Sequence, residues 1–189
     1  MGVLVRGIVL AAGRSRRMGQ DKATLMIEGE PVLHRIDRLM GVLGLVPVYS
    51  LRADQLDLLP VGREPLHDRW PEAGPLGGIA TALDAFPGEA ILVVPVDMPL
   101  LGAEYLRLLL SAGGAEVACL RADSELSPLP SLWMPSCRDV VVGEVEARRL
   151  AVRAMLDQLR VEVVDVPAEA LWNVNDADDY RELPRRWMS

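Results

Sequence analysis

Short apolar runs alternate with longer amphipathic segments along the first two thirds of the chain. The short runs are rich in β-branched residues and are apolar on both faces, which predicts strands over 5–11, 46–51, 90–96 and 115–120. Apolar positions at helical spacing predict helices over 31–43, 77–86 and 103–112. Strands that are buried on both faces and alternate with helices indicate an α/β fold, in which helices cover both faces of a largely parallel sheet.

The alternation becomes less regular after about residue 121. Residues 127–134 and 160–166 read as further strands, and residues 147–159 between them read as a helix. The Pro-rich stretch around residues 128–135 could be a linker, but it is short and flanked by apolar residues. We therefore expect a single domain over residues 1–189. Ligands of such sheets bind beyond the carboxyl ends of the strands, so polar residues that follow a predicted strand are the candidate functional residues.

Composition and charge exclude several classes of function. The net charge of −7 argues against a broad surface for nucleic acid or anionic lipid. Cys119 and Cys137 lie in no metal-binding or redox spacing, as is usual for reduced cysteines of a cytosolic protein. Arg6 interrupts the apolar amino-terminal run, unlike a signal peptide, and no apolar stretch reaches membrane-spanning length. We expect a cytoplasmic protein that engages neither nucleic acid nor membrane.

The stretch "LAAGRSRRMGQDKA", residues 10–23, follows the first predicted strand and concentrates positive charge in an acidic protein. Gly13 and Gly19 allow a ligand to approach the backbone closely. Lys22 is the single lysine of the chain, beside nineteen arginines, and its compact ammonium suits a place between phosphate oxygens where a broad guanidinium would not fit. The stretch matches neither the GxGxxG nor the Walker pattern. A phosphate-binding loop is thus one interpretation, and a solvated charged turn is the other.

Asp97 ends the apolar run "AILVVPV" and is followed by Met98 and Pro99. At the carboxyl end of a parallel strand it should face the crevice that Lys22 also reaches. Mg²⁺ prefers one or two carboxylates plus substrate phosphates over a complete protein cage. Asp97 is therefore a candidate magnesium ligand, although an aspartate at a strand end is common and can be purely structural.

A glycine- and proline-rich stretch, "HDRWPEAGPLGGI", spans residues 67–79. It predicts a turn from Gly74 to Gly78 that leads into a helix and exposes backbone groups able to read a flat ring or an anion. The stretch could equally be only a tight connection. If it reads a nucleotide, Gly77→Val should weaken nucleotide binding before it weakens stability.

Both asparagines of the chain lie in "WNVNDADDY", residues 172–180. Asn173 and Asn175 are two positions apart, so on an extended backbone they point to the same side and could present amides to a ligand or metal. Helix capping is the structural alternative, because Asn175 or Asp176 suits the cap of a helix starting at Ala177.

These four motifs, in this order, resemble those of the molybdenum cofactor guanylyltransferases, which join the guanylyl part of GTP to the phosphate of molybdopterin. "LAAGRSRRMGQDKA" looks like that family's signature loop, "AGPLGGI" like its guanine-side turn, "VVPVDMPLL" like its magnesium strand and "NVNDADDY" like its carboxyl-terminal asparagine segment. The resemblance implies a three-layer αβα nucleotidyltransferase fold with a mostly parallel sheet. It also implies GTP in the N-terminal half and molybdopterin toward the C-terminal half.

The resemblance further implies roles for individual residues. It makes Arg17, Lys22 and Asp97 catalytic, with the first two on the phosphates and Asp97 on Mg²⁺. Asn173 and Asn175 would bind the acceptor. The nucleotide would lie against Leu10, Ala11, Ala12, Gly13, Lys22, Asp68, Pro75, Leu76, Gly77 and Asp97. Transient contact with other enzymes of molybdenum cofactor biosynthesis, or with the target enzymes, is a further expectation.

Two positions depart from the family pattern. Ala12 stands where a glycine is usual, and Tyr49 where an asparagine tends to follow the second strand. They leave open a molybdopterin cytidylyltransferase, or another nucleotidyltransferase that acts on a phosphorylated small molecule. A nucleotide-binding regulatory module without turnover is a third reading. The chain shows no nucleophilic triad, and a phosphate acceptor needs none, because its second pKa of about 6 leaves it largely ionised at neutral pH.

Overall fold

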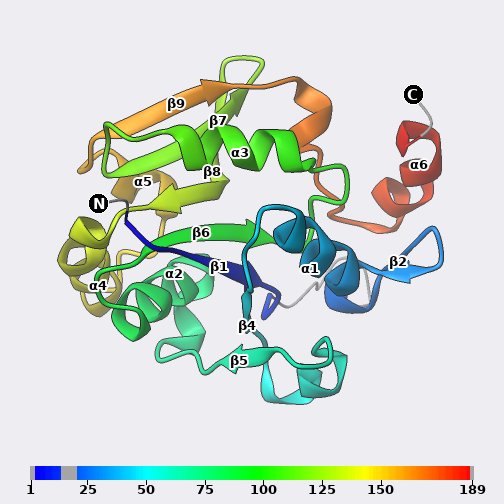
Figure 1. Cartoon of the computed structure of the whole chain (residues 1–189), viewed down its shortest axis with the longest axis horizontal. Coiled ribbons are helices and arrows are strands. Elements are labelled where there is room, and N and C mark those ends of the chain that lie inside the picture. The colour runs from blue at the N-terminus through cyan, green and yellow to red at the C-terminus, as the bar shows by residue number, and fades with distance from the viewer. Residues whose placement is uncertain (1–2, 14–20, 188–189) are drawn as a thin grey trace.

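A mixed seven-stranded sheet runs through the centre of the protein in the order β5-β4-β1-β6-β8-β7-β9 (Figure 1). The computed structural model describes residues 3–13 and 21–187. Only β8 runs antiparallel to its neighbours, so the expected mostly parallel sheet is confirmed. The strands, in chain order, are β1 (Val5–Leu10), β4 (Val48–Ser50), β5 (Glu64–Leu66), β6 (Ala90–Pro95), β7 (Val117–Ala122), β8 (Glu125–Trp133) and β9 (Val161–Asp165).

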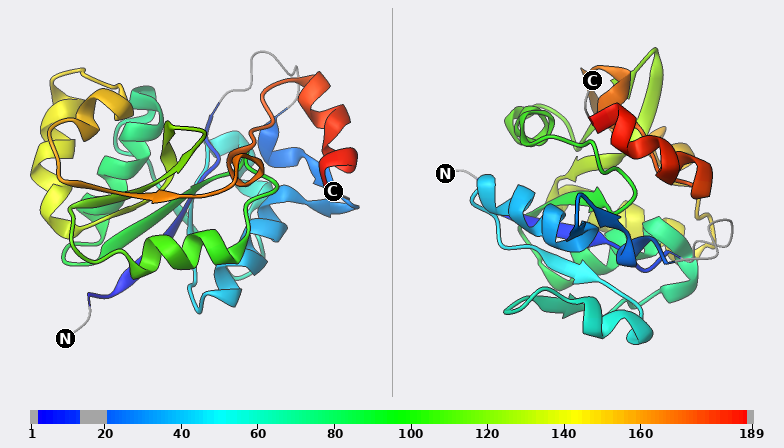
Figure 2. Two further views of the ribbon diagram at one scale, coloured as in Figure 1. Left: turned by 90° about the horizontal axis from the view of Figure 1, so that it is seen from above. Right: turned by 90° about the vertical axis from the view of Figure 1, so that its right-hand side faces the viewer.

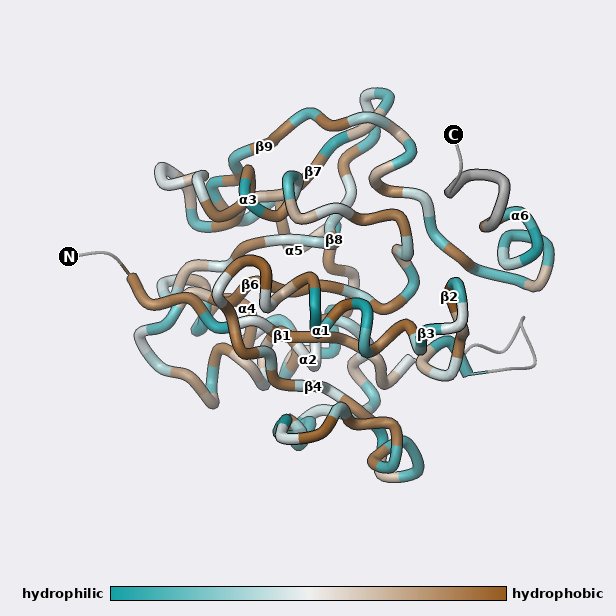
Figure 3. Tube along the Cα trace, turned by 45° about the vertical axis from the view of Figure 1, so that its right-hand side comes forward, coloured by the Kyte–Doolittle hydropathy of each residue, from teal (hydrophilic) through white to brown (hydrophobic). Residues whose placement is uncertain are grey.

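Helices cover both faces of the sheet, which gives the expected three layers. Along β6, Leu92 and Val94 belong to one buried cluster, with α1 and α3, while Ile91 and Val93 belong to the other, with α2, α4 and α5. This strict alternation explains why the apolar run of β6 is buried on both sides. In Figure 3 the residues of β1 are coloured as hydrophobic, whereas the coloured part of α6 is largely hydrophilic. The helices are α1 (Val32–Val42), α2 (Gly74–Ala85), α3 (Ala103–Ser111), α4 (Arg138–Glu146), α5 (Val152–Leu156) and α6 (Ala177–Trp187).

The C-terminal part of the chain returns to a segment near the amino terminus. After β9 and a short 3-10 helix (Ala168–Leu171), α6 lies beside the small hairpin of β2 (Met26–Ile27) and β3 (Glu30–Pro31), as both views of Figure 2 show. The Tyr180 hydroxyl donates a hydrogen bond to the Met26 carbonyl at 2.6 Å. Within the described residues, no helix has the length and apolar character needed to span a membrane.

The predicted helix over 147–159 is wrong in its bounds. The chain forms α4 over Arg138–Glu146, turns at Arg148, whose φ is +60°, and resumes as the short α5. The valines at 140–142 favour a strand by composition. Val141 and Val145 nevertheless lie one helical turn apart and are buried together with Cys137. Tertiary packing therefore decides this segment against its β-branched composition.

The predicted strand over 127–134 is present as β8 despite its prolines. Ser127 pairs with Leu120 and Ser131 with Cys119, so residues 128–130 form a bulge opposite a continuous β7. Pro128 and Pro130 lie in that bulge, where the ladder needs no N–H from them.

Candidate active site

Four neighbouring strands end at one edge of the sheet, because β5, β4, β1 and β6 are all parallel. The loop that begins with Ala11 follows β1, Asp68 follows β5 by two residues, and Asp97 follows β6 by two residues. This edge therefore gathers the residues that the sequence singles out, as expected for ligand sites in such sheets. Arg17 and Gly19 lie outside the described residues.

Lys22 meets Asp97 at this edge. Lys22 is the first residue of η1 (Lys22–Thr24), a short 3-10 helix that follows the loop. Its Nζ donates to Asp97 Oδ2 at 2.9 Å and to Asn175 Oδ1 at 3.3 Å. The side chains of Lys22 and Asp97 are 16% and 28% exposed, so the pair is half-buried yet open to a ligand. The expectation that Lys22 and Asp97 reach the same point is confirmed.

The asparagine segment crosses directly over the end of β6. The Val174 N–H donates to the Asp97 carbonyl at 2.8 Å, which fixes the residues on either side. Asp176, rather than Asn175, caps α6, because its Oδ1 accepts from the N–H groups of Asp178 and Asp179. Asn175 is thereby left available to Lys22.

The oxygen atoms gathered here suit a hard divalent cation. Asp97 supplies a carboxylate, and Asn175 supplies an amide oxygen. Asn173, two residues before Asn175, has a buried Oδ1 with no hydrogen-bond partner among the residues that the structure describes. No group of three or more His, Cys, Asp or Glu side chains that could hold a metal ion by themselves occurs in residues 3–13 and 21–187. Such an incomplete oxygen set fits Mg²⁺, which takes its remaining ligands from water and substrate phosphates.

The glycine-rich stretch forms the first turn of α2 instead of a turn before it. The helix begins at Gly74, three residues earlier than predicted, so Pro75, Leu76 and Gly77 lie in its first turn, where proline is well tolerated. The Leu76 side chain is fully buried and faces the core, whereas Gly74 and Pro75 are exposed. A Cβ at Gly77 would lie 2.4 Å from the Trp70 carbonyl oxygen. Gly77→Val would thus disturb packing at once, which argues against the order of effects expected from the sequence.

Gly78 and Leu10 show how tightly α2 packs against the end of β1. A Cβ at Gly78 would lie 2.7 Å from Leu10 Cδ2 and 3.6 Å from Ser50 Oγ. The close approach brings the first turn of α2 beside the loop that follows β1. This contact joins the two segments that carry the predicted nucleotide-binding residues: Leu10, Ala11, Ala12 and Gly13 at the end of β1, and Pro75, Leu76 and Gly77 at the start of α2.

Asp68 lies between β5 and α2 and is held in place by two hydrogen bonds. Its Oδ1 accepts from the Trp70 N–H and from the Thr81 hydroxyl, each at 2.9 Å. The Arg69 guanidinium stacks 4.8 Å from the centre of the Trp70 ring. These contacts fix the strand-to-helix connection at the same edge as Asp97.

Tyr49 lies within β4 and not after it. It is fully buried, and its hydroxyl donates to Asp37 Oδ1 of α1 at 2.7 Å. Burial and this hydrogen bond raise the pKa of Tyr49. Tyr49 therefore belongs to the core beneath α1, and the residues that follow β4 at the edge are Leu51 and Arg52.

Sequence reasoning missed three polar residues that surround the loop. Arg52 and Gln55 both contact the Asp21 carboxylate, which directly precedes Lys22. Asp21 lies inside the quoted motif, but nothing in its spacing assigned it a role. The one available signal was the spacing of three between Arg52 and Gln55 after a predicted strand, which suits a helix start but does not reveal the partner.

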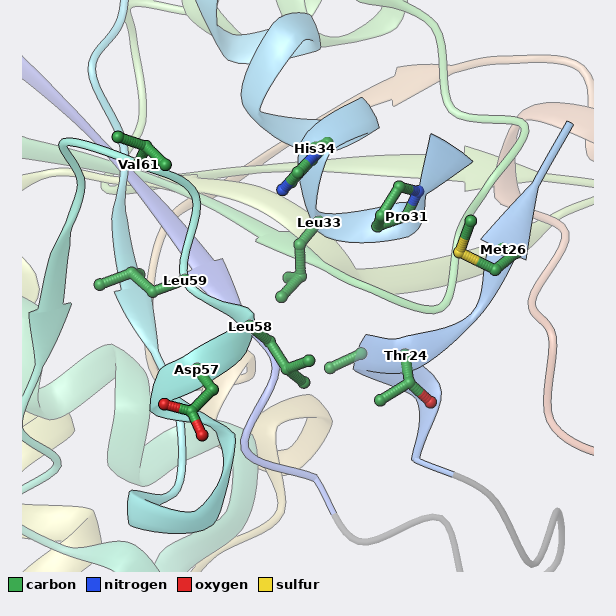
Figure 4. Close-up of a pocket in the computed structure, with 10 residues that line it drawn as sticks. Thr24, Met26, Pro31, Leu33, His34, Asp57, Leu58, Leu59 and Val61 are labelled. Carbon is green, nitrogen blue, oxygen red and sulfur yellow. The ribbon is translucent and has the colours of Figure 1, made fainter. Parts of the chain in front are cut away.

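A separate pocket opens beside η1, between the start of α1 and the segment 57–61 (Figure 4). Its walls are mainly apolar, with His34, Asp57 and Thr24 as polar members. None of the residues predicted for the site lines this pocket, so it is not part of the cluster around Lys22 and Asp97.

Lys22 follows a glycine-flanked loop and meets Asp97 at the carboxyl edge of a three-layer sheet, an arrangement that fits the nucleotidyltransferase class. The profile of the MobA-like NTP transferase domain matches residues 7–165. The chain belongs to this family. A relative from Xanthomonas euvesicatoria pv. vesicatoria, named molybdenum cofactor guanylyltransferase, is 34% identical, and the alignment covers 94% of this chain and 93% of the relative.

Solved structures share the fold over nearly the full chain. The molybdopterin-guanine dinucleotide biosynthesis protein A of Archaeoglobus fulgidus superposes with a TM-score of 0.80 at 22% identity, covering 97% of this chain and 98% of that one. A Mycobacterium tuberculosis protein crystallised in complex with manganese superposes with a TM-score of 0.71 at 19% identity, covering 96% and 98%. The nucleotidyltransferase fold that the sequence motifs implied is confirmed.

Proposed function

We propose that this protein is a molybdenum cofactor guanylyltransferase, which transfers GMP from GTP to the phosphate of molybdopterin and releases pyrophosphate. The observation that carries the proposal is the convergence of Lys22, Asp97 and Asn175, which come from three distant parts of the chain. The activity named for the full-length relative agrees with it. GTP and molybdopterin are accordingly the proposed substrates.

The reaction requires alignment and charge neutralisation more than acid–base chemistry. An oxygen of the molybdopterin phosphate forms a bond to the α-phosphorus of GTP, and the bond from that phosphorus to the bridging oxygen breaks, so that pyrophosphate leaves. The attacking phosphate is already ionised, because its second pKa is about 6. What the protein must supply is a fixed in-line arrangement and positive charge beside the phosphate oxygens.

Lys22 and Asp97 meet these needs in our proposal. Lys22 places its ammonium on the triphosphate, together with Arg17 of the same loop. Asp97 would hold Mg²⁺, with the amide oxygen of Asn175, which shares the Lys22 ammonium with it, and the unpaired amide oxygen of Asn173 as further candidate ligands. The bound cation supplies positive charge to the phosphate oxygens as a Lewis acid. The manganese found with the related Mycobacterium tuberculosis protein is in keeping with a divalent cation.

The two substrates divide between the two halves of the chain in this proposal. Guanine lies against backbone groups of Leu10–Gly13 and of Pro75–Gly77, with Asp68 near the guanosine. Molybdopterin lies toward the C-terminal half, against Asn173 and Asn175. The contact between Asn175 and Lys22 supports a meeting of the two substrates beside this pair, where transfer from the α-phosphorus would take place.

A direct test compares GTP, CTP, ATP and UTP. Binding of each nucleotide is measured by calorimetry with Mg²⁺ present, and product formation is followed with molybdopterin as acceptor. We expect binding and transfer with GTP at least tenfold above the other three. A preference for CTP would instead support the cytidylyl alternative, which Ala12 favours, and the absence of transfer with every nucleotide would overturn the proposal.

A further inference from the structure

Arg52 connects the two ends of the loop that carries the candidate phosphate-binding residues. It follows β4 and precedes the 3-10 helix η2 (Ala53–Leu58). Its Nη1 donates to the carbonyls of Ala12, at 3.1 Å, and Gly13, at 3.3 Å, on the incoming side of the loop. Its Nη2 donates to Asp21 Oδ2, at 2.5 Å, on the outgoing side. One guanidinium thus spans both sides.

Gln55, three residues after Arg52, also bonds to both sides of the loop. Its Nε2 donates to the Ala11 carbonyl at 3.1 Å and to Asp21 Oδ2 at 2.7 Å, while its Oε1 accepts from the Arg52 N–H at 2.8 Å. Gln55 is only 1% exposed. A buried amide is costly unless its donors and acceptors are satisfied, and here the loop satisfies them.

Asp21 carries this connection to Lys22. While its Oδ2 accepts from Arg52 and Gln55, its Oδ1 accepts from the Ala23 N–H at 3.0 Å and so caps η1, the helix that Lys22 starts. Burial alone would raise the pKa of Asp21, but the hydrogen bonds from Ala23, Arg52 and Gln55 together hold it below its usual value. The charged Asp21 carboxylate therefore connects Arg52 and Gln55, at the start of η2, with η1, whose first residue is Lys22.

We propose that Arg52 and Gln55 are positioning residues for GMP transfer, which hold Ala11–Gly13 and Asp21 at a fixed separation and thereby set the place of Lys22. The assignment of Lys22 to the triphosphate comes from the proposed function, on which this inference rests. The contacts of Arg52 and Gln55 do not depend on it.

The guanidinium of Arg52 is committed to protein oxygens. Its Nε donates to Asp54 at 3.0 Å, and Nη1 and Nη2 contact Ala12, Gly13 and Asp21. A planar fork can reach these acceptors at once, whereas the single ammonium of a lysine cannot. The same contacts engage the two backbone carbonyl oxygens of Ala12 and Gly13, which would otherwise repel phosphate oxygens near the loop. Arg52 thus acts on the reaction through the loop and not by touching the nucleotide.

Hydrogen exchange without nucleotide tests the connection itself. In Arg52→Lys we expect the amides of residues 21–24 to exchange at least tenfold faster than in the wild type, with sheet amides unchanged. Arg63→Lys is the matched control, because Arg63 is exposed to a similar extent and makes a two-nitrogen contact with Asp37 away from the loop. Unchanged exchange at residues 21–24 in Arg52→Lys would overturn the inference.

A double-variant cycle tests whether Arg52 acts through Lys22. Arg52→Lys alone should lower kcat by at least tenfold, whereas in the Lys22→Met background the same change should lower it less than threefold further. Full multiplication of the two effects would mean that Arg52 acts on the nucleotide itself and would contradict the proposal. Asp21→Asn provides a second route, because it removes the shared acceptor, and it should reproduce both results.

The two sets of results separate this inference from the proposed function. If the wild-type protein fails to transfer GMP, the proposed function is lost, yet the exchange data still decide whether Arg52 holds Asp21. If the wild type transfers GMP but the exchange and the cycle are unaffected, only the positioning role is lost.

Discussion

Lys22 Nζ lies 2.9 Å from Asp97 Oδ2, so the ammonium forms an ion pair with the carboxylate that is proposed to hold Mg²⁺. The two cations therefore compete for one oxygen when the site holds no nucleotide. A bound triphosphate changes this balance, because its oxygens offer Lys22 another partner and complete the shell of the metal. The pair predicts that nucleotide and metal bind cooperatively.

The first prediction follows from this competition. Lys22→Met should bind Mn²⁺ in the absence of nucleotide about tenfold more tightly than the wild type, because Asp97 loses its ion-pair partner, while turnover is nearly lost. Manganese titration followed by electron paramagnetic resonance measures the affinity. Arg6→Met removes a comparable ion pair, with Glu89 at the amino-terminal edge of the sheet, and should leave the affinity unchanged. Equal manganese affinity in Lys22→Met and wild type would contradict the competition.

The second prediction concerns the charge of Asp97. Asp97→Asn keeps the shape of the side chain but removes the charge that offsets the cation, so turnover with GTP should fall by roughly two orders of magnitude or more. Its melting temperature should stay within a few degrees of the wild type, because the pair is half-buried and open to water. Glu89→Gln, which breaks the pair with Arg6, is the control and should keep its activity. Activity of Asp97→Asn within a few-fold of wild type would remove Asp97 from the mechanism.

The third prediction contrasts two helical glycines. Gly77→Ala places a Cβ where only 2.4 Å separates it from the Trp70 carbonyl and 2.9 Å from Ala73 Cβ, so it should destabilise the protein by about 1–3 kcal/mol. A Cβ at Gly143, in α4, meets nothing within 4 Å, so Gly143→Ala should stabilise by about 0.5–1 kcal/mol. Urea unfolding measures both. The same sign for both substitutions would show that packing does not decide the effect at Gly77.

The fourth prediction concerns acid. Hydrogen bonds from Arg63 outweigh burial, and with the hydrogen bond from Tyr49 they hold the pKa of Asp37 below its ordinary value of 3.8. The unfolded chain therefore takes up a proton on Asp37 at a higher pH than the folded protein does, so this stabilisation is present above about pH 4 and is lost as the pH falls below it. The stability difference between wild type and Asp37→Asn should accordingly be largest near pH 7. It should shrink by at least half at pH 2.5, as measured by urea unfolding across that range, and a constant difference would refute the assignment.

The layers of the fold and the convergence of Lys22 with Asp97 follow from the sequence because both depend on local patterns. An apolar run marks each parallel strand, and parallel strands bring their carboxyl ends to one edge. The boundary between α4 and α5 cannot be predicted from the sequence in this way. The valines at 140–142 favour a strand by composition, but packing against α2 buries Val141 and Val145 as one face of a helix.

The surroundings of the loop are also beyond local patterns. Asp21 accepts from Arg52 and Gln55, more than thirty residues away, and no periodicity records which carboxylate a given guanidinium meets. The asparagine segment was ambiguous for a related reason, because Asn175 and Asp176 cap helices about equally well. Only the packing of α6 assigns the cap to Asp176 and leaves Asn175 facing Lys22.

The contacts of Lys22 also bear on when the protein becomes active during its synthesis. Asp97 lies 75 residues after Lys22, and Asn175 lies 153 residues after it. Both partners of the ammonium are therefore synthesised much later than Lys22. Asp97 follows β6, which gains its neighbour β8 only after residues 125–133 have been made, and the asparagine segment crosses the end of β6 later still. Contacts so distant along the chain form late in folding. A growing chain can therefore acquire most of its sheet before Asn175 reaches Lys22, so under the proposed function the site is completed late in synthesis.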